Sequence, residues 1–305
     1  MTLTQKEIER LFRVPAKGRI RLKDFDPGWS GRKELKQLGK GEFKARASEL
    51  LTKNREALNA AQEVLWATDC HSVLVVLQAM DGAGKDGAIR HVMSGVNPQG
   101  CQVFSFKKPS DEELDHNFLW RYMRALPERG RIGLFNRSYY EDVLVVRVHP
   151  EILERQKLPA SALGKDVWKH RFDDINGFEQ HLVRNGTLVI KFFLHMSKKE
   201  QRRRFLARLD DPHKQWKFSD ADIAERQHWD SYQQAFEDAI NQTSTKWAPW
   251  WVIPADNKWV TRVLVSSVIT RSIEKLGLKM PVASPERQVE LVEARRRLNG
   301  EAAQR

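Results

Sequence analysis

Short apolar runs alternate with amphipathic segments through the middle of the chain. The first run, SVLVVLQ at 72–78, is rich in Val and lacks polar alternation, as is typical of a strand buried on both faces. Similar runs follow at 101–106, 131–135, 187–193 and 250–254, with helical patterns between them. Strands that alternate with helices predict an α/β fold with a parallel sheet covered on both faces.

The flanking segments have different patterns. Residues 1–70 read as a basic extended opening, followed by a helix in GEFKARASELLTKNREALNAAQEVLWATD that packs on the core. Residues 71–280 carry the alternating strands and helices and form the expected core. Within it, the polar and basic stretch at about 196–245 interrupts the alternation, and we expect a helical lid there. Residues 281–305 are expected to form a charged helical tail.

The charge of the chain narrows the choice of partners. The 305 residues are 41% hydrophobic, enough for a core. The net charge of +12 indicates either an anionic partner, such as nucleic acid, a membrane surface or polyphosphate, or a surface that keeps the protein soluble. No run of about 18 apolar residues occurs, and charges occupy the start, where a signal peptide needs an apolar stretch. We therefore expect a cytoplasmic protein with no membrane partner.

A glycine-rich turn directly follows the first strand. LQAMDGAGKDG leads into the helical pattern AIRHVMSGV, which is the strand, turn and helix context of a phosphate-binding loop. Small residues let backbone N–H groups approach phosphate oxygens, the helix start favours anions, and a Lys neutralises the transferred group. A tight turn without a ligand is the alternative. The expected phosphate-binding residues are Asp81, Gly82, Ala83, Gly84, Lys85, Asp86 and Gly87.

Two positions of this loop depart from the general G-x-x-x-x-G-K-[ST] pattern. Ala79 replaces the first Gly, and Asp86 replaces the hydroxyl residue that binds the metal. Asp81 and Asp86 instead place carboxylates where Mg²⁺ would bridge phosphates. On this evidence either carboxylate could hold the metal.

A polar cluster, NRSYYED, closes the strand at 131–135. Asn136 stands where P-loop proteins commonly carry an acid that holds magnesium. Arg137 is the candidate phosphate clamp, because its planar fork meets phosphate oxygens in pairs. Glu141 and Asp142 are the nearest carboxylates. A solvated loop of mixed charge is the alternative.

The lid segment is rich in cations. KKEQRRRFLAR at 198–208 has six basic residues and one acid, and Lys214 and Lys217 follow. On a helix, Arg204 and Arg208 share one face, so we expect a ridge of cations above a buried apolar stripe. A solvated surface helix is the alternative. A row of cations downstream of a phosphate loop fits a long polyanion better than one triphosphate.

Together, LQAMDGAGKDGAIRHVMSGVNPQG, FNRSYYED and RFLARLDDPHKQWKFS resemble the polyphosphate kinase 2 family, over residues 30–275. The resemblance implies a P-loop kinase-like three-layer α/β/α fold with a central parallel sheet and a helical lid. It also implies dependence on Mg²⁺, with Mn²⁺ as an alternative ion, and a homodimer or homotetramer. The implied reaction moves phosphoryl groups between inorganic polyphosphate and nucleotides, converting AMP and ADP reversibly to ADP and ATP, with GMP and GDP as further acceptors.

The resemblance also assigns site residues. Asn136 replaces an Asp of many members and supplies no negative charge, so Asp81 becomes the expected metal ligand. Asn136 together with Glu141 resembles the class III branch, which phosphorylates both nucleoside mono- and diphosphates. The expected catalytic residues are Asp81, Lys85, Arg137, Arg204 and Arg208. Beyond the loop, Arg203, Lys214 and Lys217 are expected to bind polyphosphate, and Asn136, Glu141, Asp142 and Arg147 the nucleotide.

Two other functions follow from the residues. One is a nucleoside monophosphate kinase with ATP as donor. The choice of phosphoryl donor, ATP or polyphosphate, would distinguish it from the enzyme that the resemblance implies. The other is a non-catalytic binder of a polyanion, which rests on the basic charge alone. The sequence has no helix-turn-helix, zinc-finger or RNA-recognition signature, so we expect no nucleic-acid partner.

Overall fold

Five parallel strands form the centre of the computed structural model, which describes residues 4–16, 18–31 and 40–302. Every strand predicted from an apolar run is confirmed to within two residues at each end. The sheet order is β2–β3–β1–β4–β5, so β1 lies in the middle and the chain crosses to both sides of it. The strands are β1 (Ser72–Gln78), β2 (Cys101–Ser105), β3 (Ile132–Asn136), β4 (Thr187–His195) and β5 (Trp250–Pro254).

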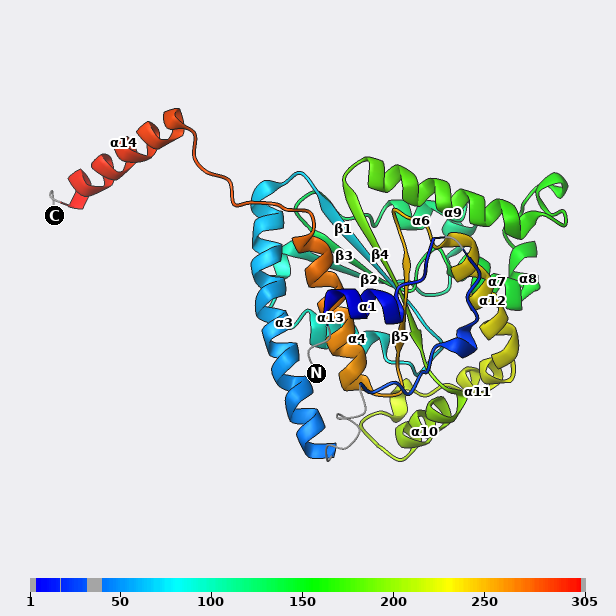
Figure 1. Cartoon of the computed structure of the whole chain (residues 1–305). Coiled ribbons are helices and arrows are strands. Elements are labelled where there is room, and N and C mark those ends of the chain that lie inside the picture. The colour runs from blue at the N-terminus through cyan, green and yellow to red at the C-terminus, as the bar shows by residue number, and fades with distance from the viewer. Residues whose placement is uncertain (1–3, 17, 32–39, 303–305) are drawn as a thin grey trace.

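Helices cover both faces of the sheet and give the three-layer α/β/α fold (Figure 1). Successive side chains of β1 point to opposite faces: Val73 and Val75 join one hydrophobic cluster, and Leu74 and Val76 join the other. One face carries α1 (Gln5–Phe12), α3 (Lys40–Thr68), α4 (Lys85–Val92) and α13 (Lys258–Glu274). The other carries α6 (Trp120–Met123), α7 (Glu141–Val148), α9 (Val167–Arg184) and α12 (Trp229–Thr243).

Residues 196–245 are not one continuous lid, contrary to our expectation. They form α10 (Lys198–Leu209), α11 (Asp220–Gln227) and α12. Trp229, Tyr232, Phe236 and Ile240 of α12 are buried against the sheet and α9, because their spacing of three or four residues places them on one face. α12 therefore belongs to the core, whereas α10 and α11 lie together at one end of the sheet (Figure 1).

The opening of the chain is not wholly extended. Helix α1 begins there because Thr4 and Glu7 form a capping box. The following segment crosses β5: Val14 N donates a hydrogen bond to Trp250 O at 2.8 Å, and Asp256 N donates to Pro27 O at 3.1 Å. The N-terminal residues therefore brace the last strand of the sheet.

The tail carries a helix, as predicted. Helix α14 (Pro285–Ala302) projects away from the three layers (Figure 1). In the part of the chain that the structure describes, no helix is long and apolar enough to cross a membrane. The remaining short elements are η1 (Leu22–Asp24), η2 (Pro98–Gly100), α5 (Asp111–Leu114), α8 (Pro150–Glu154), η3 (Ala160–Ala162) and η4 (Gln215–Lys217).

Candidate active site

The phosphate loop connects the carboxyl end of β1 to α4. Gly82 and Gly84 have φ of +84° and +102°, a conformation that Gly adopts without steric cost. Helix α4 begins at Lys85, so its free N–H groups face the loop, as in anion sites at helix starts. Phe205 Cε1 would lie 3.0 Å from a Cβ on Gly82, so α10 packs directly on the loop.

Lys85 and Asp81 form the charged centre of the loop. Lys85 is buried, and its Nζ donates to Ala79 O at 2.9 Å and lies 3.8 Å from Asp81 Oδ1. Burial lowers the pKa of Lys85, and the Asp81 carboxylate opposes this shift. Burial alone would raise the pKa of Asp81, but Lys85 and Arg137 bring it below its ordinary value. Asp81 is therefore ionised beside two cations.

Arg137 has a strained backbone at the centre of the site. Its φ of +66° is uncommon for a residue other than Gly, and its N donates to Leu77 O at 3.1 Å. The guanidinium donates to Asp81 Oδ1 at 2.9 Å, and Glu141 and Asp81 raise its pKa despite burial. Arg137 lines three neighbouring cavities. Arg137 therefore lies beside the phosphate loop, and its role as a phosphate clamp stays a prediction.

Asn136 joins the ends of three neighbouring strands. It is buried, and its Nδ2 donates to Asp86 Oδ1 at 2.7 Å and to Ser105 Oγ at 3.3 Å. Because β2, β3 and β1 are adjacent in the sheet, their carboxyl ends bring Ser105, Asn136 and the loop together. Asn136 therefore orients the Asp86 carboxylate.

A cavity of about 760 Å³ opens over the loop. Sequence reasoning missed four of its cations: Arg90 on α4, which lies in the loop motif but was given no role, and Lys107 after β2 and Lys258 and Arg262 on α13, which belong to no motif. The position of Lys258, shortly after the carboxyl end of β5, was an available signal. Three Asp and ten cations line the cavity, the latter being Lys85, Arg90, Lys107, Arg137, Arg203, Arg204, Arg208, Lys214, Lys258 and Arg262.

Arg204 is buried, whereas we expected it to lie on an exposed ridge of cations. Its guanidinium donates to Ala83 O at 2.7 Å and Ala255 O at 2.6 Å, and more weakly to the carbonyls of Gly82 and Asp256 at 3.1 Å. Arg204 therefore ties the phosphate loop to the segment after β5. Its Nε donates to Glu200 Oε1 at 2.7 Å, so protein groups already accept from all three guanidinium nitrogens, and the contacts of Arg204 are those of a positioning residue.

The other predicted cations of the lid have several environments. Arg203 is exposed and paired with Glu200 at 2.6 Å, and Arg208 pairs with Asp222 at 3.2 Å. Lys214 lines the large cavity and pairs with Asp211. The side chain of Lys217 lies outside the described residues.

Arg147 lies apart from the other predicted residues. It is the one predicted nucleotide-binding residue that lines none of the three cavities described here. Its Nη2 donates to Asp238 Oδ2 of α12 at 2.7 Å. The structure therefore supports a role for Arg147 in packing α7 against α12.

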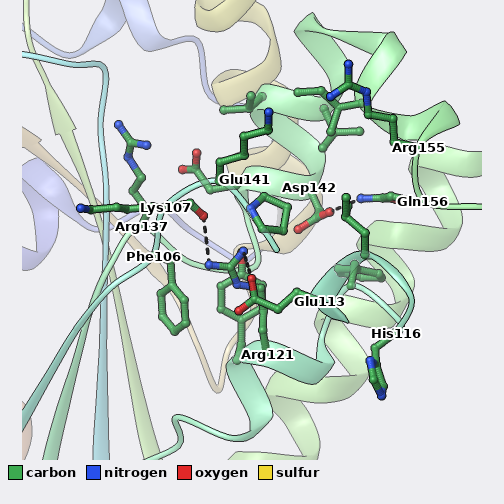
Figure 2. A pocket seen from close by; sticks show the side chains of 18 residues that line it. Phe106, Lys107, Glu113, His116, Arg121, Arg137, Glu141, Asp142, Arg155 and Gln156 are labelled. Atoms are coloured by element: carbon green, nitrogen blue, oxygen red, sulfur yellow. Dashed lines mark hydrogen bonds and ion pairs between the residues drawn. The ribbon is translucent and has the colours of Figure 1, made fainter. Parts of the chain in front are cut away.

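A second cavity, of about 240 Å³, adjoins Arg137 on the side of α7 (Figure 2). Arg121 donates to Lys107 O at 3.0 Å and pairs with Glu113 at 3.1 Å across its floor. Sequence reasoning found Arg137, Glu141 and Asp142 of this cavity but not the residues between β2 and β3, which carry no recognisable motif. Its apolar walls include Phe106, Leu114, Phe118, Val145, Val146 and Ile152.

Asp142 lines this second cavity but points to Gln156, whose Nε2 donates to it at 2.8 Å (Figure 2). Burial raises the pKa of Asp142 to about 6, although Arg171 opposes the shift. A raised pKa means that the folded state binds the proton more tightly than the unfolded chain does. The ionised carboxylate therefore costs stability at neutral pH, and this cost shrinks as the pH falls below 6 and is lost below the ordinary value of 3.8.

We expect the Asp142→Asn variant to reveal this cost. On going from about pH 7 to about pH 4, the parent should gain up to about 3 kcal/mol in unfolding free energy relative to Asp142→Asn, because a shift of one pKa unit is worth about 1.4 kcal/mol. Urea unfolding of both proteins across this range measures the difference. A difference that does not change with pH would contradict the raised pKa.

The donor groups of the loop fit magnesium carried by phosphates. Among the described residues, no group of three His, Cys, Asp or Glu side chains could hold a metal. Mg²⁺ needs no such cage, since proteins usually bind it through one or two carboxylates together with substrate phosphates. Asp81 and Asp86 both line the large cavity and supply these carboxylates.

Comparison with known proteins agrees with this geometry. Residues 42–280 match the family described as polyphosphate kinase 2. The chain is 54% identical to the ADP-polyphosphate phosphotransferase of Rhodopseudomonas palustris, over 84% of this chain and 89% of that protein. It is 45% identical to the AMP/ADP-polyphosphate phosphotransferase of Meiothermus ruber, over 88% of this chain and 94% of that protein.

The same resemblance holds in three dimensions. The crystal structure of polyphosphate kinase 2 from Arthrobacter aurescens superposes with a TM-score of 0.80 at 38% identity, covering 93% of this chain and 96% of that one. The fold and the phosphate loop thus agree with the family match, which covers most of the chain. The chain belongs to the polyphosphate kinase 2 family.

Proposed function

We propose that this phosphotransferase moves phosphoryl groups between inorganic polyphosphate and both nucleoside mono- and diphosphates, with Mg²⁺ as the ion. The observation that carries the proposal is the meeting of two chemically different cavities at Arg137. The larger is lined by ten cations, whereas the smaller combines apolar walls with charged side chains of both signs. This pairing suits a polyanionic donor on one side and a nucleotide on the other.

The large cavity has an excess of positive charge that suits the donor. The pKa of Lys258 is lowered by burial and by the nearby cations Arg204, Arg262 and Arg203. Cations that repel one another favour an anionic ligand that neutralises several of them at once. A chain of phosphates meets this need along the cavity, because each unit offers oxygens to a different side chain.

The smaller cavity suits the acceptor. Phe106 and Val145 offer an apolar surface to a base, as in most sites for small ligands. Arg137 and Lys107 line both this cavity and the large one, so they can hold the acceptor phosphate at the junction. The acceptor phosphate would then face the end of the polyphosphate.

The reaction we propose is an in-line transfer without a covalent enzyme intermediate. An oxygen of the terminal nucleotide phosphate attacks the last phosphorus of the chain, and the bridging P–O bond breaks to release polyphosphate one unit shorter. Lys85 and the loop N–H groups hold the phosphates, while Arg137 offsets the charge that moves. Mg²⁺, when bound at Asp81 and Asp86, would neutralise phosphate oxygens. Helix α10 helps to exclude water.

Use of both AMP and ADP is supported by Glu141. Its Oε1 accepts a hydrogen bond from Gln78 Nε2 at 2.8 Å, so the carboxylate is held where the second cavity meets a third one, of about 170 Å³, that Asp81 also lines. The relative from Meiothermus ruber is named an AMP/ADP-polyphosphate phosphotransferase. Asn136 and Glu141 are the residues on which we base the same breadth of acceptors here.

The test is an assay with purified protein, Mg²⁺ and long-chain polyphosphate. We expect ATP from ADP, and ADP followed by ATP from AMP, with products separated by chromatography. Product from ADP alone would remove the monophosphate step. Turnover of a monophosphate with ATP but not with polyphosphate would instead establish an ordinary nucleotide kinase. Polyphosphate binding without any turnover would leave a non-catalytic binder.

A further inference from the structure

A group of cations extends beyond the reacting centre, along the face formed by α3, α4 and α13. Arg90 and His91 lie near the end of α4, Arg262 lies in the first turns of α13, and Arg55 lies on α3. The three helices pack together on one side of the sheet (Figure 1). Arg90 and Arg262 line the large cavity, and Arg262 Nη2 would lie 4.0 Å from a Cβ on Gly87. The group is therefore continuous with the phosphate loop.

The charges of this group repel one another. The pKa of Arg262 is lowered by burial and then by Arg90, Arg55 and Arg204. The pKa of His91 is also lowered, first by burial and further by Arg262, Arg90 and Arg55. Among the described residues, no carboxylate pairs with these three arginines. The fold therefore holds them close together without a compensating anion.

Packing explains only part of the group. Arg55 Nε donates to His91 O at 2.7 Å and so caps the end of α4. Arg262 lies over the Trp259 ring, with its Cζ 5.0 Å from the ring centroid. Arg90 is exposed and makes no ion pair among the described residues. Contacts within the protein therefore account for Arg55 and Arg262 but not for Arg90 at the edge of the cavity.

We propose that Arg90 and Arg262 form a distal anchoring site for polyphosphate, where a long chain leaves the phosphate loop and crosses α4. The proposal rests on the proposed function, since it assumes polyphosphate in the large cavity. The site recognises a linear chain of phosphates longer than the reacting centre can hold. It raises the affinity for long chains and takes no part in the transfer itself.

A single-stranded nucleic acid fits this face less well. Such strands are usually held by a basic groove together with aromatic rings on which bases stack. On these three helices, the Trp259 ring already faces two cations: Arg262 at 5.0 Å and Lys44 Nζ at 5.5 Å from the centroid. The face therefore offers charge without a free stacking surface.

The test uses the full-length double variant Arg90→Gln/Arg262→Gln, with Arg287→Gln as the matched control. Arg287 carries the same charge on α14, outside the three layers, and pairs with Glu290. Gln keeps much of the side chain that packs on Trp259. The readouts are the KM and kcat with long-chain polyphosphate and ADP, the dissociation constant of the same polyphosphate, and its dependence on salt. The thermal midpoint verifies that each variant is folded.

We expect the double variant to raise the KM for long-chain polyphosphate roughly 3- to 30-fold, as for two exposed charge contacts. The KM for ADP should stay at the value of the control. The slope of log affinity against log salt should become shallower by about 0.7 for each lost phosphate contact.

Two results would overturn the distal site. The first is an affinity and salt slope equal to those of the control. The second is weaker binding of single-stranded RNA with unchanged binding of polyphosphate. A parent protein that lacks activity with polyphosphate would instead count against the proposed function, so the two failures are distinguishable.

Discussion

Replacing Lys85 with Met should lower kcat by about 10²- to 10³-fold, the cost of removing one charged group from a preorganised site. Met keeps the length of the buried side chain but cannot neutralise a phosphate. The Lys85 ammonium donates a hydrogen bond to Ala79 O at 2.9 Å. Residues 79–84 of the phosphate loop have no side chain that could donate to a phosphate in its place. Initial rates with saturating polyphosphate and ADP measure the effect.

The fold of the Lys85→Met variant should survive, because the side chain is one of many contacts of α4. The thermal midpoint and circular dichroism therefore serve as its controls. A second control is Lys275→Met, which removes an exposed cation at the end of α13 that pairs with Glu9 at 2.5 Å. A Lys85→Met protein that is folded and turns over at a near-native rate would exclude Lys85 from the mechanism.

The largest effect on stability should come from a fully buried ion pair beneath the site. Lys191 Nζ of β4 donates to Glu179 Oε2 at 2.6 Å and to Thr243 O at 2.7 Å, and both charged side chains are 0% exposed. The hydroxyls of Tyr139 and Tyr140 donate to Glu179 Oε1 at 2.9 and 2.8 Å. Both oxygens of the Glu179 carboxylate therefore accept hydrogen bonds.

We expect Lys191→Met to reduce the unfolding free energy by about 3–5 kcal/mol, because it leaves an uncompensated charge in the core. Urea unfolding measures the change. The double variant Lys191→Met/Glu179→Gln should be more stable than the single variant, since a neutral amide oxygen still accepts from the tyrosines. A single variant within about 1 kcal/mol of the parent would show that Glu179 becomes protonated or hydrated at little cost.

The same ion pair connects the core to the chemistry. Tyr139 and Tyr140 directly precede Glu141 and follow the turn that holds Arg137 in its left-handed conformation. Glu179 lies on α9, and Lys191 lies on β4. Two buried charges on separate elements thus fix the start of α7, from which Glu141 reaches the cavities.

The sequence by itself determined the layers of the fold and the position of the phosphate loop. Both are local properties: an unbroken apolar run such as 72–78 predicts a strand buried on both faces, and the residues that follow it carry the loop. The positions of Lys85 and Arg137 followed from the same local logic, since Lys85 closes the turn after β1 and Arg137 directly follows β3. These predictions needed no knowledge of distant contacts.

The roles of the lid and the extent of the cavity were decided by the tertiary structure. In the sequence, Arg204 looked like one of several equivalent cations of the lid. In the fold, its hydrogen bonds to Ala83 O and Ala255 O hold the phosphate loop against the segment after β5. Helix α12 looked like part of a polar lid, yet the sheet buries its apolar face.

Arg90 and Arg262 illustrate the same limit at the edge of the cavity. They are far apart in the sequence and meet only because α4 and α13 pack together. Local sequence patterns specify helices and strands, whereas the role of a charged side chain depends on which distant groups the fold places around it.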